Sequence, residues 1–349
     1  MSNQAPRKAS ISEVARLCGV HKSTVSRVLN NRYPAGYSVS DAVKAKVLKV
    51  ADELNFRPNP VLRTMSASRT GLIALLGMSD FNRSSRGPVE EAVNVMLREF
   101  ADLDYRICTS FLTVGDEAYE SPPWRVDGAV VLNPTALEQY EAIHTSGIPY
   151  LVMNGVSRAD RPSVNVDDYA GARLAVEYLA ELGHRRIAYV KTNQFNVKLP
   201  LDAQGRPHWH PSVAERERGY LAALAELGLT AVPGHGDWDR PLPDAVSAAV
   251  TQGATAILSY DHVEAVEVVG RLQRAGHKVP DDISVLCFNE AFPTAEVFPS
   301  LTAMVVPGDE MALAAVRLLK EAIDGKPYQQ AVVREKIRPR ESTGPAPSR

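Results

Sequence analysis

Four hydrogen-bonding side chains fall on one face of a helix predicted over residues 22–30. The apolar residues of this segment recur at three- and four-residue spacing, which predicts a buried stripe on its other side. The outward residues are Lys22, Ser23, Ser26 and Arg27. Lysine and arginine donate well to guanine O6 and N7, and serine can serve as donor or acceptor. This chemistry suits the edges of base pairs in a DNA groove.

The residues around this helix predict a three-helix unit. Ser10 and Glu13 form a capping box at the start of a first short helix, and Gly19 supplies the turn into the second. A third helix is predicted to begin after a cap at Ser40. Two short helices joined by a tight glycine turn, with a polar face on the second, fit the major groove of DNA.

The charge distribution agrees with a nucleic-acid contact at one end of the chain. Residues 1–70 hold twelve Lys and Arg against four Asp and Glu, a net charge of +8. The remainder holds 27 basic and 37 acidic residues, a net charge of −10. A small basic unit on an acidic body is expected when only that unit meets a polyanion. A basic face that is merely solvated is the alternative.

From residue 71 onward, apolar strands alternate with helices. The first series consists of strands over 72–78, 105–112, 128–132 and 150–153, with a helix over 88–102. The second consists of helices over 170–183, 215–227 and 263–275 and strands over 186–190, 254–259 and 283–288. Such alternation predicts parallel sheets covered by helices on both faces. Two units in series predict two lobes with a ligand cleft between them.

The N-terminal motif resembles the head of the lac repressor/galactose repressor family of transcriptional regulators. The likeness runs from Ile11 to Ala15, through Gly19-Val20, and from Ser23 to Asn30. The segment 53–59, ELNFRPN, resembles the end of that family's third helix. The resemblance continues with gaps almost to the C-terminus. It implies a small all-α helix-turn-helix head joined to a periplasmic-binding-protein-like α/β body of two doubly wound parallel-sheet lobes.

The resemblance implies a role for each polar residue of the head. Lys22, Ser23 and Arg27 are expected to read base edges. The residues expected to contact phosphates are Thr24, Ser26, Asn30 and Arg32. His21 departs from the family, which usually has a Ser or Thr cap at this position, and the loop 31–37 is longer than usual.

The segment 58–70 resembles the family's hinge, which becomes a short helix on DNA and enters the minor groove. The expected hinge residues are Asn59, Leu62, Arg63 and Met65. Met65 stands where the family usually has a leucine wedge, and an apolar side chain there can still part a base step. The alternative is a flexible linker without a role in DNA binding.

The body carries further family motifs. Residues 166–171, VDDYAG, resemble V-D-N-x-x-G, and residues 182–188, LGHRRIA, resemble L-G-H-x-x-I-A. The resemblance implies an effector pocket at Met78, Arg216, Trp238, Tyr260, Asp261 and Asn289. Arg216 could instead form a surface ion pair with a neighbouring glutamate, and Trp238 could pack into its lobe.

Two departures bear on the effector. Tyr260 and Asn289 stand where the family has a pocket Asn and a pocket Asp. These changes remove acceptors that hold sugar hydroxyls and make the pocket less anionic and more aromatic. The sequence therefore favours a sugar-related or other metabolite rather than a simple neutral monosaccharide.

These observations predict a domain plan. Residues 1–57 form the head, 58–70 the hinge, 71–340 the body and 341–349 a disordered tail. Lobe 1 is expected at about 71–183 and 300–326, and lobe 2 at about 184–299 and 327–340. The expected partners are double-stranded operator DNA, a small-molecule effector and a second copy of the chain. The tail lacks heptads, so a tail-mediated tetramer is not expected.

Other classes of protein are less well supported. The three cysteines are far apart, no export signal or membrane span is apparent, and a cytoplasmic location is expected. A metal site at His208-Trp209-His210 lacks a carboxylate or Cys partner, so neither metal nor cofactor is predicted. The alternatives are a solute-binding protein or an enzyme that shares only the body fold. A DNA-binding protein that lacks effector response, or that uses a corepressor, also stays open.

Overall fold

The computed structural model describes residues 9–30, 33, 36–56, 69–78, 88–111, 118–192, 201, 208–233 and 240–348. The chain divides into two compact units, Met1–Thr70 and Gly71–Arg349. Their boundary coincides with the end of the segment 58–70 that was predicted as a hinge. No helix among the described residues combines the length and the apolar character needed to cross a bilayer.

Three helices are described in the first unit: α1 (Ile11–Cys18), α2 (Lys22–Asn30) and α3 (Asp41–Glu53). The three helices share one apolar cluster, to which they contribute the completely buried side chains of Val14, Val25 and Val47 respectively. The Ser10 hydroxyl accepts a hydrogen bond from the Glu13 backbone N–H, as the capping-box pattern predicts. Gly19 ends α1 at φ +69°, a conformation that favours glycine, and turns the chain into α2.

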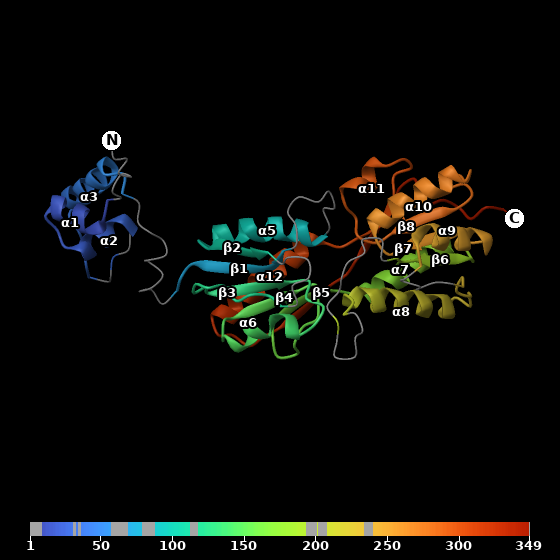
Figure 1. Ribbon diagram of the computed structural model, residues 1–349, viewed down its shortest axis with the longest axis horizontal. Coiled ribbons are helices and arrows are strands. Elements are labelled where there is room, and N and C mark those ends of the chain that lie inside the picture. Colours follow the sequence, from blue (N-terminus) through green and yellow to red (C-terminus); the bar gives the residue numbers. More distant parts are fainter. Residues whose placement is uncertain are drawn as a thin grey trace, which may run out of the picture. The chain divides into compact units, whose positions relative to one another are not determined.

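The second unit contains two sheets, each with its own helices (Figure 1). The strand order of the first is β10 (Gln330–Val333), β5 (Ser163–Val166), β4 (Tyr150–Met153), β3 (Gly128–Leu132), β1 (Leu72–Met78) and β2 (Arg106–Phe111). All its neighbouring strands are parallel. This sheet with its helices is called lobe 1.

Alternate residues of the lobe 1 strands enter two separate cores. Ile73 and Leu75 pack with α5 (Pro88–Asp102) and α12 (Gly308–Ile323), whereas Ala74 and Leu76 pack with the residues around α6 (Glu141–Thr145). Figure 1 shows α5 and α6 on opposite sides of this sheet. Burial on both faces explains why these strands are continuous apolar runs.

The second sheet and its helices form lobe 2. Its strand order is β11 (Lys336–Arg338), β9 (Thr302–Val305), β8 (Ser284–Cys287), β7 (Ala256–Ser259) and β6 (Ile187–Val190). The pairs are parallel except β11 with β9, which is antiparallel.

Two pairs of longer helices cover the faces of the lobe 2 sheet. One face packs against α7 (Asp168–Glu181) and α8 (Pro211–Glu226), and the other against α9 (Leu242–Thr251) and α10 (His262–Arg274). The short helix α11 (Phe292–Glu296) precedes β9. Figure 1 shows α8 and α10 on opposite sides of the sheet. The predicted two-lobed α/β body is therefore confirmed.

The crossings between lobes differ from the predicted positions near residues 183, 299 and 326. The chain enters lobe 2 after β5, because the apolar face of α7 packs on α8 and the second sheet. It returns between β9 and α12, and crosses again between β10 and β11. The prediction assigned α7 and β9 to lobe 1 and β10 to lobe 2. Sheet pairing and helix packing reverse all three assignments.

The prediction of a disordered tail over 341–349 is wrong for residues 341–348, which pack along lobe 2. Ser342 is completely buried, and its hydroxyl donates to the Val285 carbonyl at 2.6 Å. The same hydroxyl accepts from the Thr302 backbone N–H at 2.8 Å. Residues 341–348 are rich in Pro, Gly and Ser, but side-chain hydrogen bonds hold them against lobe 2.

Candidate functional site

The polar face of α2 is accessible on the first unit. Lys22 and Ser23, in its first turn, are exposed, and Thr24, Ser26 and Arg27 are half-buried. The apolar residues of the same helix enter the core that α1 and α3 complete. These five side chains, all predicted to contact DNA, therefore belong to a helix rather than to a loop.

The His21 side chain caps the start of α2. Its Nδ1 lies 3.4 Å from the Ser23 backbone nitrogen and 2.9 Å from the Ser23 hydroxyl. An acceptor at this position satisfies one of the free N–H groups of the first turn, as a serine or threonine would. His21 thus differs from the family's usual Ser or Thr but still caps the helix, through a ring nitrogen instead of a hydroxyl.

Arg27 is held by an aromatic side chain that was not among the predicted site residues. Its guanidinium carbon lies 4.2 Å from the centroid of the Tyr37 ring. The Tyr37 hydroxyl also lies 3.3 Å from Thr24 Oγ1. Hydrogen bonds from Thr24 and then Arg27 hold the pKa of Tyr37 below its usual value. The spacing of Thr24 and Arg27 places both on one side of α2, next to this ring.

Six of the predicted contact residues lie outside the described residues, namely Arg32, Asn59, Leu62, Arg63, Met65 and Trp238. The side chains of Asn30 and Met78 lie outside them as well.

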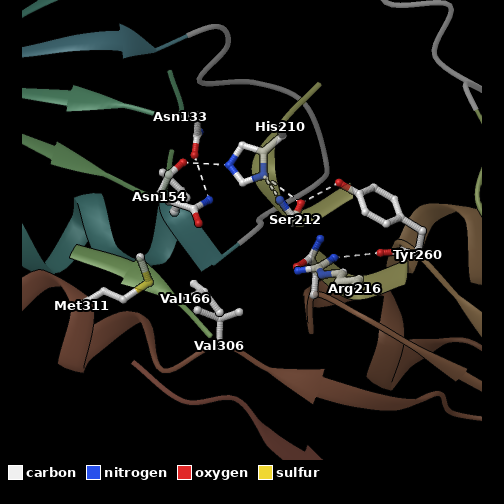
Figure 2. A pocket seen from close by; sticks show the side chains of 11 residues that line it. Asn133, Asn154, Val166, His210, Ser212, Arg216, Tyr260, Val306 and Met311 are labelled. Carbon is white, nitrogen blue, oxygen red and sulfur yellow. Dashed lines mark hydrogen bonds between the residues drawn. The ribbon is translucent and has the colours of Figure 1, made fainter. Parts of the chain in front are cut away.

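A cavity of about 180 Å³ is lined by residues of both lobes (Figure 2). Its apolar wall consists of Val89, Val166, Val306 and Met311. Its polar lining consists of Asn133, Asn154, His210, Ser212, Arg216, Tyr260 and Asn289. Three of the predicted effector residues, Arg216, Tyr260 and Asn289, therefore meet at one cavity.

Two asparagines extend the polar lining into lobe 1. Asn133 directly follows β3 and Asn154 directly follows β4, at φ +50° and +56°. The Asn154 side-chain amide donates to Asn133 Oδ1 at 2.9 Å. Because the carboxyl ends of neighbouring parallel strands meet at one sheet edge, the two amides lie together in the lining of the cavity.

His210 connects lobe 2 to lobe 1 across this cavity. Its Nε2 lies 2.8 Å from the Asn154 carbonyl oxygen, to which it donates, and its Nδ1 lies 2.7 Å from the Ser212 hydroxyl. The Ser212 hydroxyl in turn lies 2.8 Å from the Tyr260 hydroxyl. Burial lowers the pKa of His210, which favours the neutral ring that this pattern requires. Figure 2 shows this relay running from Asn154 to Tyr260.

Arg216 is 4% exposed, and each of its guanidinium nitrogens has a partner. Its Nε donates to Asp168 at 2.7 Å, Nη1 to the Tyr260 carbonyl at 3.0 Å and Nη2 to Asn289 Oδ1 at 3.0 Å. The guanidinium also stacks 4.2 Å from the centroid of the Phe288 ring. The alternative of a surface ion pair with a neighbouring glutamate is therefore wrong.

Asp261 supports the site without lining the cavity. Its carboxylate accepts from the Val263 backbone N–H at 2.7 Å and so caps α10. Its other oxygen accepts from the Asn289 side-chain amide at 3.3 Å. Asn289 is thereby fixed between a carboxylate and Arg216, with its oxygen toward the guanidinium.

Comparison with known proteins identifies relatives along almost the whole chain. Residues 10–59 match the family of bacterial regulatory proteins of the lacI type, and residues 176–343 match a periplasmic binding protein-like domain. The HTH-type transcriptional repressor PurR of Vibrio parahaemolyticus is 30% identical over 354 residues, which cover 93% of this chain and 95% of that protein. The chain belongs to the LacI family. The HTH-type transcriptional regulator reg1 of Streptomyces lividans is 27% identical over 354 residues, which cover 97% of each chain.

Solved structures of LacI-family proteins share the fold. A lac repressor dimer bound to operator and the anti-inducer ONPF gives a TM-score of 0.76 at 19% identity and covers 97% of this chain and 100% of that one. A complex of the transcriptional regulator CelR with cellobiose gives a TM-score of 0.62 at 22% identity and covers 96% of this chain and 99% of that one. As a LacI-family member, the chain is a DNA-binding transcriptional regulator, as the helix-turn-helix pattern predicted.

A second carboxyl group of this LacI-family body lies behind Arg216. Glu335 is 5% exposed, and its Oε1 lies 3.7 Å from Arg216 Nη2. Burial raises the pKa of Glu335 to about 8, against the attraction of Arg216. Burial disfavours the charge of Arg216 too, but Asp168 and then Glu335 hold its pKa above the usual value. The charge of Arg216 is thus neutralised inside the protein.

The family motif over 166–171 serves this buried cluster. A Cβ atom on Gly171 would lie 1.6 Å from Glu335 Oε2, so only glycine leaves room for the carboxyl group. Asp168, in the same motif, is the closest carboxylate partner of Arg216. The motif therefore supplies one carboxylate partner of Arg216 and leaves room for Glu335, which lies between β10 and β11.

Sequence reasoning missed Asn133, Asn154, His210 and Ser212 in the cavity and Tyr37 in the head. One signal was available for the two asparagines, since each stands at the carboxyl end of a predicted parallel strand. Among the described residues no group of three or more His, Cys, Asp or Glu could hold a metal ion.

Proposed function

We propose that this chain is a repressor that binds a palindromic operator as a homodimer and responds to a small molecule in the inter-lobe cavity. The observation that carries the proposal is the pairing of two surfaces in one chain. α2 offers Lys22, Ser23 and Arg27 on an accessible face, and the body holds a polar cavity lined by both lobes. A ligand that bridges the lobes can favour one arrangement of the body over another.

In this proposal the base-reading residues are Lys22, Ser23 and Arg27, and Thr24 and Ser26 contact phosphates. Arg32, the side chain of Asn30 and the hinge residues Asn59, Leu62, Arg63 and Met65 keep their predicted roles. The relatives support a regulator rather than an enzyme, because they are named as transcriptional regulators. The protein acts in the cytoplasm, where its operator lies.

The effector is a small neutral molecule with both donors and acceptors. Arg216 has partners on Asp168 and Asn289, so it has no free charge to offer an anion. The polar lining otherwise consists of amides, hydroxyls and the His210 ring, opposite an aliphatic wall. Met78 and Trp238 keep their predicted places near the effector. This chemistry fits a compact sugar-related metabolite or a heterocycle.

The DNA half of the proposal is tested by selecting bound duplexes from genomic fragments with the full chain and measuring affinity against salt. Lys22→Ala is expected to weaken binding and to relax preference at one base pair by about 1–3 kcal/mol. Lys49→Ala, on α3, removes the same charge from a side chain that is 78% exposed and serves as the matched control. Equal effects of the two substitutions would refute base reading by Lys22.

The effector half is tested by thermal shift of the full chain against a panel of neutral and anionic metabolites. Val166→Phe fills the cavity from β5 and is expected to abolish the shift caused by any hit, while operator binding without ligand persists. Val332→Phe makes the same change at an exposed strand position of β10. Hits that bind Val166→Phe as well as wild type, or only anionic hits, would contradict the proposed site.

The homodimer is tested by light scattering on the purified chain and on its complex with a selected operator duplex. The proposal expects two chains per palindromic duplex, with each head on one half-site. One chain per duplex would contradict it.

A further inference from the structure

We propose that Tyr37 is a positioning residue for base reading: its ring holds the guanidinium of Arg27 in place for contact with a guanine. The inference rests on the proposed role of Arg27 and adds a specificity determinant outside the recognition helix. Tyr37 lies between α2 and α3, in a loop that the helix-turn-helix pattern leaves unassigned.

Two contacts with α2 fix the position of the Tyr37 side chain. The Arg27 guanidinium carbon lies 4.2 Å from the centroid of the Tyr37 ring, and the Tyr37 hydroxyl lies 3.3 Å from Thr24 Oγ1. The ring is thus fixed at its hydroxyl end by one α2 residue while its face supports another. Gly36, at φ +79°, precedes it and sets the direction of the chain.

The contact with Tyr37 leaves Arg27 able to read DNA. The guanidinium has five N–H donors, so the tyrosine contact, which includes a hydrogen bond from Arg27, leaves others for guanine O6 and N7. No ion pair involves Arg27 among the described residues. Its charge is therefore available to a ligand, and its long side chain is already restricted before DNA binds.

Restriction of this kind has a measurable consequence. An unsupported arginine loses rotamer freedom when it forms a base contact, so a ring that orders it beforehand strengthens the contact. The effect should concentrate on the base pair that Arg27 reads. A Tyr37 that only stabilised the packing of the head would weaken all DNA sequences alike.

The chain offers a matched control in the same loop. Tyr33 also lies beside a cation, with Lys44 Nζ 5.5 Å from the centroid of its ring. Lys44 is in α3 and pairs with Asp41 at 3.1 Å, away from the predicted reading face of α2. Loss of the Tyr33 ring removes a similar aromatic side chain without touching Arg27.

The test selects duplexes from a random pool with full-length wild type, Tyr37→Ala, Tyr37→Phe, Arg27→Ala and Tyr33→Ala, and compares base preferences and affinities. Tyr37→Ala is expected to relax preference at the same base pair as Arg27→Ala. It should weaken binding to the wild-type site by about two- to fivefold. Tyr37→Phe keeps the ring but loses the contact with Thr24, so it should retain more of the preference than Tyr37→Ala, and Tyr33→Ala should not alter it. In the Arg27→Ala background, Tyr37→Ala should cause no further loss.

The outcomes separate this inference from the proposed function. If Arg27→Ala leaves every base preference unchanged, base reading by Arg27 fails, and the role of Tyr37 fails with it. If Arg27→Ala relaxes one preference while Tyr37→Ala does not, only the positioning role is overturned. An equal loss on selected and random duplexes for Tyr37→Ala also overturns it, because that result indicates general destabilisation of the head.

Discussion

The head and the body each contain an arginine predicted to contact a ligand, and the two side chains are held in different ways. Arg27 is half-buried, lies over the ring of Tyr37 and has no ion pair among the described residues. Arg216 is 4% exposed and donates to Asp168, the Tyr260 carbonyl and Asn289. The side chain of Arg27 is held in place while its charge stays unpaired. The side chain of Arg216 is held in place by partners that also neutralise its charge.

The difference indicates that one arginine can contact a ligand directly while the other has a structural role. A side chain that must exchange water for guanine or phosphate needs its charge free, so support by a ring suits it better than a carboxylate. Arg216, in contrast, connects α8 to α7, to the end of β7 and to the segment between β10 and β11, so it needs partners on several sides. Arg216 therefore organises the cavity, and the groups left for a neutral ligand are the amides and hydroxyls around it.

Breaking the Arg216 network should have the largest effect. Arg216→Met leaves Asp168 and Glu335 buried without their cation, and we expect the free energy of unfolding of the body to fall by about 3–5 kcal/mol. Denaturant unfolding measures the loss. Arg218→Met is the control, because that arginine lies in the same helix, is 64% exposed and pairs with Glu215. Equal losses for the two variants would show that Arg216 is not the centre of the network.

Replacement of each arginine by lysine sharpens the comparison. Arg216→Lys cannot satisfy three separate acceptors, so we expect a loss of stability of about 2 kcal/mol. Arg27→Lys keeps the charge but loses two-point contact with guanine, so we expect about 1–2 kcal/mol less discrimination at one base pair. Unfolding and duplex titrations of both variants give the full comparison. A stability loss for Arg27→Lys that matched that of Arg216→Lys would remove the distinction.

Local structure was predictable where a segment's own pattern decides it. The strands 128–132 and 150–153 and the helices 22–30 and 88–102 appear with the predicted bounds, because unbroken apolar runs and regular spacing mark them. Lobe membership was not predictable in this way. The apolar stripe of α7 indicates that one face is buried but not which sheet covers it. The strand β10 lies at a sheet edge and its residues alternate in exposure, so its pattern does not identify the sheet that it joins.

The site was predictable only in part, for a related reason. Arg216, Tyr260 and Asn289 stand at family motif positions, and the structure brings them together at one cavity. His210 and Tyr37 come from irregular segments, where neither periodicity nor a family motif marks them. Their roles follow from contacts with residues at distant positions, namely Asn154 and Arg27. Such contacts depend on the path of the whole chain.

The bridge between the lobes offers a smaller test. His210→Ala removes the hydrogen bond to the Asn154 carbonyl and the acceptor for Ser212, so we expect a loss of stability of about 1 kcal/mol. Small-angle scattering should also show a more open body. His208→Ala, two residues earlier, is the control. If both variants unfold and scatter alike, His210 does not hold the lobes together.

The last prediction concerns pH and Glu335, the buried carboxyl group beside Arg216. Burial raises the pKa of Glu335 to about 8, whereas an unperturbed glutamate titrates at 4.5. As the pH rises between these values, the unfolded chain releases its proton first, and the contribution of Glu335 to stability falls. Glu335→Gln removes this dependence, so its unfolding free energy should decline less steeply than that of wild type from about pH 5 to about pH 8.

Glu341→Gln is the control for this titration. Glu341 is exposed, and hydrogen bonds from the Ser300 backbone N–H and hydroxyl lower its pKa, the opposite direction to Glu335. Its contribution is already complete above its unfolded pKa, so its loss should leave the slope between about pH 5 and about pH 8 unchanged. Parallel curves for wild type and Glu335→Gln would mean that Glu335 is ionised in the fold. Arg216 would then face two charged carboxylates rather than one.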